Sequence, residues 1–200
     1  MADLISKIKG VDNVTYDLQD KVSTFGGTNL LIGSKNLSSF ITSAATITLT
    51  NNIITLPGNT SGWDYVHTPF VSFNIINNHT LILSFEYKAS IASDTWIVTE
   101  GTASNTPKTN RTKYKDHRFT LAAKDTWTKY TQIFNNFSLT YLTSGSGDVN
   151  YFRIAFYSRT DGANLQIRYP KLERSNKPTE WTPAPQDLVT YSSETLEFFQ

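Results

Sequence analysis

The sequence has no cysteine, and this absence excludes three kinds of chemistry together. Without thiols the chain has no disulfide scaffold, no thiolate metal site and no cysteine nucleophile. The three histidines share no metal-ligand spacing with one another or with carboxylates; they are His67, His79 and His117. We therefore expect no metal site and no cofactor, and a stability that comes from packing.

An excess of charge of either sign is also lacking. Lys and Arg number 18 and Asp and Glu number 17, so the net charge is +1. No long-range field favours a polyanion or an anionic membrane. Apolar runs such as residues 81–83 are short, and the sequence opens with Met-Ala-Asp rather than with a basic and then apolar segment. We predict no nucleic-acid partner, no membrane span and no signal peptide.

Catalytic motifs are missing as well. The sequence contains no HExxH, calcium-loop, phosphate-loop or nucleophile-elbow pattern. A glycosidase carboxylate pair assembled from distant strands is still conceivable, from Glu86, Asp94, Glu100 and Asp125. Exposed acids are far more often simply solvated. We therefore predict that the protein is not an enzyme and name no catalytic residue.

Aromatic residues are abundant, at 13% of the chain. From residue 28 onward, short segments rich in β-branched and aromatic residues alternate with clusters of turn-forming residues. In residues 80–89 and 151–158, apolar side chains occupy every second position, as in strands with one buried face. Dense strands without intervening helices predict an all-β sandwich. Periodicity does not separate a jelly roll from an immunoglobulin-like sandwich, and no Cys pair favours the latter.

The turn signal Asp161-Gly162 follows the second of these segments. We interpret residues 151–158 and 164–169 as a β-hairpin around it, with a loop longer than two residues.

Residues 3–22 have a different pattern. Apolar or β-branched residues recur at alternating four- and three-residue intervals, at Leu4, Ile8, Val11, Thr15, Leu18 and Val22. This spacing predicts a coiled-coil helix, although Gly10 and Asn13 lower its helix propensity. A self-associating coil and a lone helix both stay open. We divide the chain into an N-terminal helical or coiled-coil segment (1–25), a β-sandwich (26–187) and a C-terminal extension or expression remnant (188–200).

Two end segments resemble the opening and closing signatures of a module in phage tail and baseplate proteins. The opening segment is GTNLLIGS at 27–34; the closing one is PKLE at 170–173 followed by TEWTPAPQD at 179–187. Between them, DTWTKY at 125–130 is similar to a strand entry common in sandwich-type carbohydrate-binding modules. One departure is that residues 174–176, Arg-Ser-Asn, replace a glycine often found there, which puts that turn in doubt.

The resemblance implies a fold, a function and a context. Such modules are jelly-roll sandwiches on receptor-binding, distal tail or tail-fibre proteins of phages that infect Gram-positive bacteria. It implies a non-catalytic carbohydrate-binding module that attaches the virion to host cell-wall polysaccharide. It also implies other virion tail and baseplate proteins as partners, a homo-oligomer, such as a trimer, through the N-terminal helix, and assembly in the bacterial host cytoplasm. Two alternatives stay open, namely a structural tail module without glycan binding and an accessory module of a bacterial cell-wall enzyme.

A saccharide site needs an aromatic platform and fixed polar groups, because sugars present apolar C–H faces and a polar rim. Trp96, near a strand end, is our first candidate platform, and Tyr157 is the second; a core position for Trp96 is equally compatible with the sequence. Alternation places Glu86, Arg118 and Arg153 on outward faces, and we expect a curved sheet to gather them into one groove.

A site at the rim is the alternative. Trp63 and Tyr65 follow the loop at residues 57–62, and the long polar loop at residues 100–115 is a candidate lip. The sequence leaves the sheet face and the rim equally open. One hydrogen bond to a sugar contributes about 1 kcal/mol, so a single sugar should bind at roughly millimolar concentration. Attachment then depends on multivalency.

Overall fold

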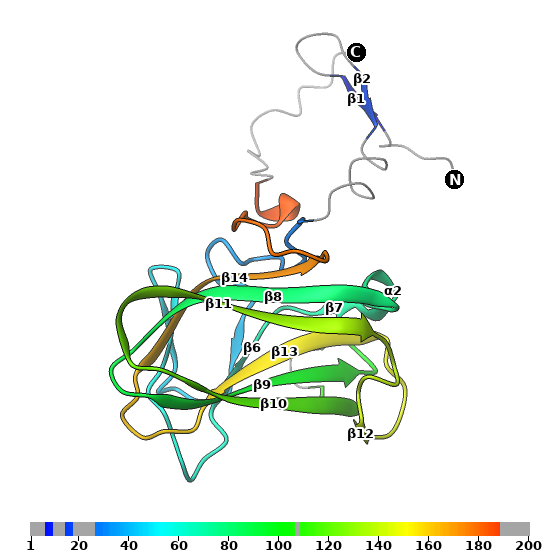
Figure 1. Ribbon diagram of the computed structural model, residues 1–200. Coiled ribbons are helices and arrows are strands. Elements are labelled where there is room, and N and C mark those ends of the chain that lie inside the picture. Colours follow the sequence, from blue (N-terminus) through cyan, green and yellow to red (C-terminus); the bar gives the residue numbers. More distant parts are fainter. Residues whose placement is uncertain (1–6, 10–14, 18–26, 107–108, 189–200) are drawn as a thin grey trace.

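The computed structural model describes residues 7–9, 15–17, 27–106 and 109–188, and its main body is a sandwich of two antiparallel sheets (Figure 1). One sheet has five strands in the order β11 (Lys124–Phe137), β8 (His79–Ala89), β14 (Leu165–Arg174), β5 (Ile53–Leu56) and β4 (Thr48–Thr50). The other runs β12 (Ser144–Gly145), β10 (Lys113–Leu121), β9 (Ser93–Thr102), β13 (Tyr151–Ser158), β6 (Tyr65–His67) and β3 (Ile41–Thr42), and its seventh strand, β7 (Val71–Ser72), also pairs with β13. The predicted all-β sandwich is confirmed.

The core lies between the sheets and is rich in phenylalanine. Phe85 of β8 meets Phe156 of β13 edge to face, with ring centroids 5.5 Å apart. Phe137 of β11 meets Phe152 of β13 in the same way at 4.9 Å. These rings are almost fully buried, and a buried Phe stabilises a fold by roughly 1.5–3 kcal/mol through the area removed from water. The alternation in the sequence therefore identified the core face of both strands correctly.

The predicted hairpin around Asp161-Gly162 is wrong. Strand β13 pairs with β9, β6 and β7, whereas β14 pairs with β8 and β5, so the two strands belong to different sheets. The connection at residues 159–164 carries the chain across the sandwich. A turn signal specifies where the chain reverses, but the pairing partner is chosen by the edges that other strands offer.

The predicted N-terminal helix is also wrong where the structure describes it. Residues 7–9 and 15–17 form two short strands, β1 (Lys7–Lys9) and β2 (Thr15–Asp17), which pair antiparallel. The β-branched and aromatic residues of these segments favour strands, and Gly10 and Asn13 are weak helix formers. The other residues of the predicted helix, and residues 189–200 of the C-terminal extension, lie outside the described residues. The described helical segments are α2 (Phe73–Ile76) and the 3-10 turn η1 (Pro185–Leu188). The sequence pattern predicts a strand over residues 71–75, but β7 ends at Ser72 and α2 begins at Phe73.

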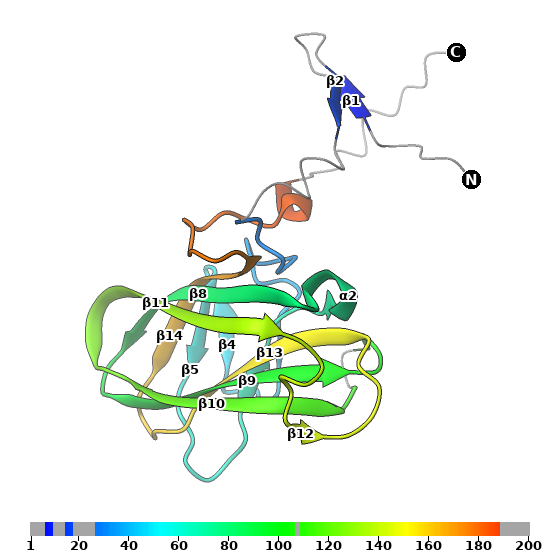
Figure 2. The same cartoon turned by 45° about the vertical axis from the view of Figure 1, so that its right-hand side comes forward.

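The two end signatures contact each other at one end of the sandwich, where η1 lies beside the entering chain (Figure 2). The Asn29 side chain donates to the carbonyls of Pro170 and Thr182 and accepts from the Leu172 N–H. Asp187 accepts from the backbone N–H of Gly33 at 2.6 Å. These signatures thus have a structural role in closing the domain. Among the described residues, no helix is long and apolar enough to span a bilayer.

Candidate functional site

Strand register arranges the outward side chains of the seven-stranded sheet in rows. Tyr157 of β13 lies opposite Trp96 of β9 on one side and Tyr65 of β6 on the other. Trp96 in turn lies opposite Arg118 of β10. Because paired residues in neighbouring strands point to the same face, three rings stand side by side across the sheet.

At its centre, the next row on the same face is made of smaller side chains, which His67 of β6 and Asp116 of β10 flank. Ala155 of β13 lies opposite Val98 of β9, two residues along each strand from the aromatic row. The row after that is large again, since Arg153 lies opposite Glu100 and Glu100 lies opposite Tyr114. Small residues at the centre of this row, between two rows of large ones, leave room for a hollow, and Val98 lines it.

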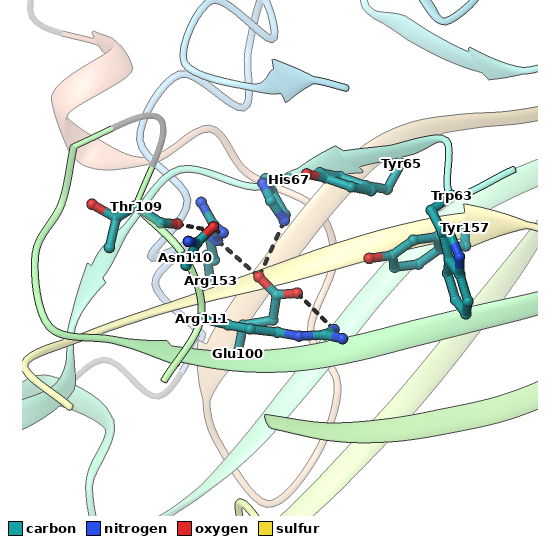
Figure 3. Close-up of a pocket in the computed structure, with 9 residues that line it drawn as sticks. All are labelled: Trp63, Tyr65, His67, Glu100, Thr109, Asn110, Arg111, Arg153 and Tyr157. Carbon is teal, nitrogen blue, oxygen red and sulfur yellow. Dashed lines mark hydrogen bonds and ion pairs between the residues drawn. The ribbon is translucent and has the colours of Figure 1, made fainter. Parts of the chain in front are cut away.

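Two adjoining cavities of about 280 and 220 Å³ occupy this face, and both are lined by Trp63, Arg111 and Tyr157. Figure 3 shows the residues that line the larger one. Together they reach the size of small-molecule sites, which is roughly 300–1,000 Å³. We call them the groove, whose lining residues are Trp63, Tyr65, His67, Trp96, Val98, Glu100, Thr109, Asn110, Arg111, Tyr114, Asp116, Arg118, Arg153 and Tyr157.

Trp63 stands at the edge of the groove and is its most exposed ring, at 60%. Its ring lies edge-on to Trp96 at 5.6 Å and to Tyr157 at 6.2 Å. The preceding loop is held by Asn59, whose Oδ1 accepts from the backbone N–H of Ser61 and Gly62 at 3.0 and 2.6 Å. A Cβ at Gly62 would lie 2.1 Å from the Asn59 amide nitrogen, so this close turn requires glycine.

A second set of contacts ties the Trp63 loop to the connection between the two sheets. Thr60 donates from its backbone N–H and its hydroxyl to the two carboxylate oxygens of Asp161, each at 2.8 Å. These hydrogen bonds lower the pKa of Asp161, so the carboxylate is ionised at neutral pH. Trp63 is therefore presented by a loop with a fixed shape.

Buried charges form the other end of the groove. Glu100 is 2% exposed and accepts from Arg153 Nε at 2.9 Å and from Arg111 Nη1 at 3.2 Å. His67 Nε2 lies 3.1 Å from the same carboxylate. Arg153, itself 4% exposed, also donates to the Thr109 carbonyl at 3.0 Å, which anchors the loop between β9 and β10 (Figure 3). The expected lip of the groove is thus held down by a buried ion pair.

The environment sets the protonation of these groups. Burial alone would raise the pKa of Glu100, but the contacts with His67 and Arg153 outweigh it and lower that pKa. Burial lowers the pKa of His67, so its ring is neutral at pH 7. Burial raises the pKa of Tyr157, which keeps its hydroxyl protonated. The groove therefore holds an ionised carboxylate, neutral rings and arginines.

Six of the seven residues predicted for a saccharide site lie in the groove: Trp63, Tyr65, Trp96, Arg118, Arg153 and Tyr157. The rim and the sheet face, which the sequence left as alternatives, meet in one site. Glu86 does not join them. It lies on β8 in the other sheet, where Arg168 Nη2 is 2.6 Å from its carboxylate. The expectation of one groove from both sheets was wrong, because the outward faces of a sandwich point in opposite directions.

Trp96 is less open than its choice as first platform implied. The Arg118 guanidinium stacks over its ring at 3.8 Å, and Trp63 approaches from the side. Tyr157 is only 4% exposed. The accessible apolar surface of the groove is therefore mainly that of Trp63.

Sequence reasoning missed His67, Glu100 and Arg111 as members of the site. The signal for Glu100 was present, because it follows Trp96 and Val98 at the two-residue spacing of one strand face. Residue 100 was expected to begin the polar loop, whereas β9 continues to Thr102. Nothing in the local sequence marked Arg111, whose place depends on how the loop folds back. Within the described parts of the chain, no three His, Asp or Glu side chains group as they would around a metal ion.

Comparisons with known proteins agree on the fold. No protein-family model and no curated protein sequence matches the chain. The second N-terminal cellulose-binding domain of β-1,4-glucanase C from Cellulomonas fimi is 15% identical with a TM-score of 0.50, over 77% of this chain and 99% of that domain. A family 11 carbohydrate-binding module from Clostridium thermocellum is 15% identical (TM-score 0.44, 76% and 98%). Tailspike protein 4 of bacteriophage CBA120 is 11% identical (TM-score 0.46, 74% and 21%). The chain thus has the antiparallel β-sandwich fold seen in carbohydrate-binding modules.

Proposed function

We propose that this protein is a non-catalytic carbohydrate-binding module whose ligand lies in the groove on the seven-stranded sheet. One observation carries the proposal: Trp63, Tyr65, Trp96 and Tyr157 gather beside a buried network of fixed hydrogen-bonding groups. An exposed ring suits the C–H face of a sugar, and the polar groups suit its hydroxyls. The sandwich fold shared with cellulose- and glucan-binding modules is consistent with this use.

The groove chemistry supports binding rather than hydrolysis. Glycoside hydrolysis uses a pair of carboxyl groups, one of which holds a proton as general acid. Two carboxylates line the groove, Glu100 and Asp116. Glu100 has a lowered pKa and three positively charged or ring partners, and Asp116 lies 3.3 Å from Arg118. Glu100, whose carboxyl group is held ionised by these partners, does not serve as a general acid at neutral pH.

The biological context is proposed from the end signatures. Their resemblance to a phage tail and baseplate module supports a role in attaching a virion to cell-wall polysaccharide of a Gram-positive host. In that setting the protein is a virion component that assembles in the bacterial cytoplasm beside other tail proteins. Weak binding per site favours a homo-oligomer, such as a trimer, because linked sites multiply avidity. Sedimentation of the purified chain tests this point, and a monomer at all concentrations contradicts it.

Binding to purified Gram-positive cell-wall polysaccharide tests the function. We expect the unchanged chain to be retained on immobilised polysaccharide and Trp63→Ala to be released, because the variant removes the exposed ring. Trp127→Ala is the matched control, since Trp127 lies on β11 of the other sheet beside Arg168. Glu86→Gln is a second control and should bind normally. Retention of Trp63→Ala equal to that of the unchanged chain would contradict the groove as the site. A chain that binds no saccharide would instead favour a structural tail module.

A further inference from the structure

The charged groups that line the groove do not balance. Three arginines face two carboxylates there, namely Arg111, Arg118 and Arg153 against Glu100 and Asp116. Arg118 pairs with Asp116 at 3.3 Å, and Arg153 pairs with Glu100 at 2.9 Å. His67 adds no charge at pH 7, because its burial lowers its pKa. One positive charge has no carboxylate of its own. It belongs to Arg111, which shares the Glu100 carboxylate with Arg153.

Arg111 is placed to receive a ligand. It lines both cavities of the groove, and its side chain is 37% exposed, whereas the Glu100 beside it is 2% exposed. Its guanidinium stacks over the Tyr114 ring at 3.9 Å, which fixes its plane. Among the described residues, Glu100 receives the one hydrogen bond that its five N–H donors make. The remaining donors form a fork of the kind that matches a carboxylate or a phosphate group.

The backbone on both sides of Arg111 is held by hydrogen bonds. The loop that carries it is tied down two residues earlier, where Arg153 donates to the Thr109 carbonyl at 3.0 Å. On its other side, Thr112 donates its backbone N–H to the Gly101 carbonyl at 2.8 Å and its hydroxyl to the Asp148 carbonyl at 2.7 Å. This guanidinium is fixed by its anchored backbone, by the Tyr114 ring and by the Glu100 carboxylate. It therefore loses little conformational entropy when a ligand binds.

We infer that the groove selects an acidic saccharide, one whose carboxylate or phosphate oxygens pair with Arg111 while a neighbouring sugar ring lies against Trp63. The inference rests on the proposed function and adds the class of sugar. A neutral saccharide would leave the fork hydrated and the surplus charge uncompensated. A charge-assisted contact adds about tenfold or more in affinity over a neutral contact.

The test is calorimetric titration of the whole chain with three probes of similar length. These are an oligogalacturonide as the carboxylate probe, a phosphodiester-linked hexose oligomer as the phosphate probe, and a neutral cello-oligosaccharide. We expect at least one acidic probe to bind roughly tenfold more tightly than the neutral one, by a difference that shrinks with added salt. The stronger acidic probe identifies the anionic group.

Variants separate this inference from the proposed function. Arg111→Gln should reduce binding of the acidic probe to the level of the neutral probe, and Arg111→Lys should restore part of it by charge alone. Arg174→Gln, an arginine outside the groove, is the matched control and should change nothing. Thermal melting of each variant establishes that it is folded. Equal affinity for acidic and neutral probes, unaffected by Arg111→Gln but lost in Trp63→Ala, overturns the acidic preference and leaves the saccharide site intact. Absence of binding by both acidic probes also overturns the acidic preference, whereas the proposed function is overturned only if the chain is not retained on cell-wall polysaccharide either.

Discussion

Single residues decide whether the outward face of the seven-stranded sheet is flat or hollow. Ala155 and Val98 leave room between the row of rings and the row of charges, and Trp63 reaches over that room from its loop. We expect the Trp63 ring to contact a ligand only while its loop holds the ring in place. Asn59 and Asp161 hold the loop, so we expect both to support the position of the ring.

Replacing Asn59 should increase the mobility of the Trp63 ring without unfolding the domain. Asn59→Ala removes the acceptor for the Ser61 and Gly62 N–H groups, which are near the surface, so we expect a loss of about 0.5–1.5 kcal/mol in unfolding free energy. Binding to cell-wall polysaccharide should weaken by about tenfold, because the ordering of Trp63 must then be supplied on binding. Urea unfolding and calorimetric titration measure the two effects.

The control for this variant is a similar turn elsewhere. Asn36 Oδ1 accepts from the Ser38 N–H at 3.1 Å in an exposed turn outside the groove. Asn36→Ala should cost a similar amount of stability and leave binding unchanged. Equal loss of binding in both variants would show that the effect is general instability rather than the position of Trp63.

At the scale of the element, each central strand serves two tasks on its two faces. Strand β13 directs Phe152, Ile154 and Phe156 to the core, and directs Arg153, Ala155 and Tyr157 to the groove. Both sets are buried, so the strand is covered on both faces although its sequence alternates. A strand of this kind fixes the groove rigidly to the core.

Truncating the inward side of β13 should act on stability. Phe156→Ala leaves a cavity opposite Phe85, and we expect it to lower the free energy of unfolding by about 3–5 kcal/mol. Ile133→Ala, at a position that is 43% exposed, should change it by less than about 0.5 kcal/mol. Urea unfolding measures both. A loss below about 1 kcal/mol in Phe156→Ala would contradict the assignment of this ring to the core.

The elements also show what the sequence did and did not determine. Strand positions with strict alternation, such as residues 151–158, were predicted correctly because each residue's face follows from its neighbours in the chain. The pairing of β14 and the position of Glu86 were wrong, because both depend on which sheet a strand joins. The helix expected near the N-terminus failed at β1 and β2, where a heptad-like spacing competed with β-branched residues.

For the site too, the sequence predicted the residues that local patterns mark and missed those that depend on long-range contacts. Its aromatic members could be named because exposed rings and turn residues are visible locally, whereas Arg111 and Glu100 meet only when the loop between β9 and β10 folds back. Long-range contacts of this kind carry no local signal in a single sequence.

At the scale of the whole molecule, one buried and one half-buried histidine make stability depend on pH. Burial, with the charge of Lys115, lowers the pKa of His117 to about 4, and burial lowers the pKa of His67. In the unfolded chain both have the ordinary value of about 6.5. Between these values the unfolded chain binds more protons than the fold, so stability is present above pH 6.5 and is lost as the pH falls below it.

We therefore expect the free energy of unfolding to be flat between pH 7 and 8 and to decrease steadily from about pH 6.5 to 4.5. Carboxylates with a lowered pKa, such as Glu100, add to the loss only below about pH 4.5. His117→Gln should reduce the slope in the upper window. A slope that is unchanged in this variant, measured by urea unfolding across the pH range, would contradict a neutral His117 in the fold.

The most direct test of the account uses two of the four tryptophans as reporters. The double variant Trp127→Phe, Trp181→Phe keeps Trp63 and Trp96 in the groove, and it should bind Gram-positive cell-wall polysaccharide as the unchanged chain does. Its fluorescence should shift on titration, with the same midpoint as calorimetry. A bound polysaccharide that leaves the emission of Trp63 and Trp96 unchanged would contradict the groove as the place where this protein holds its ligand.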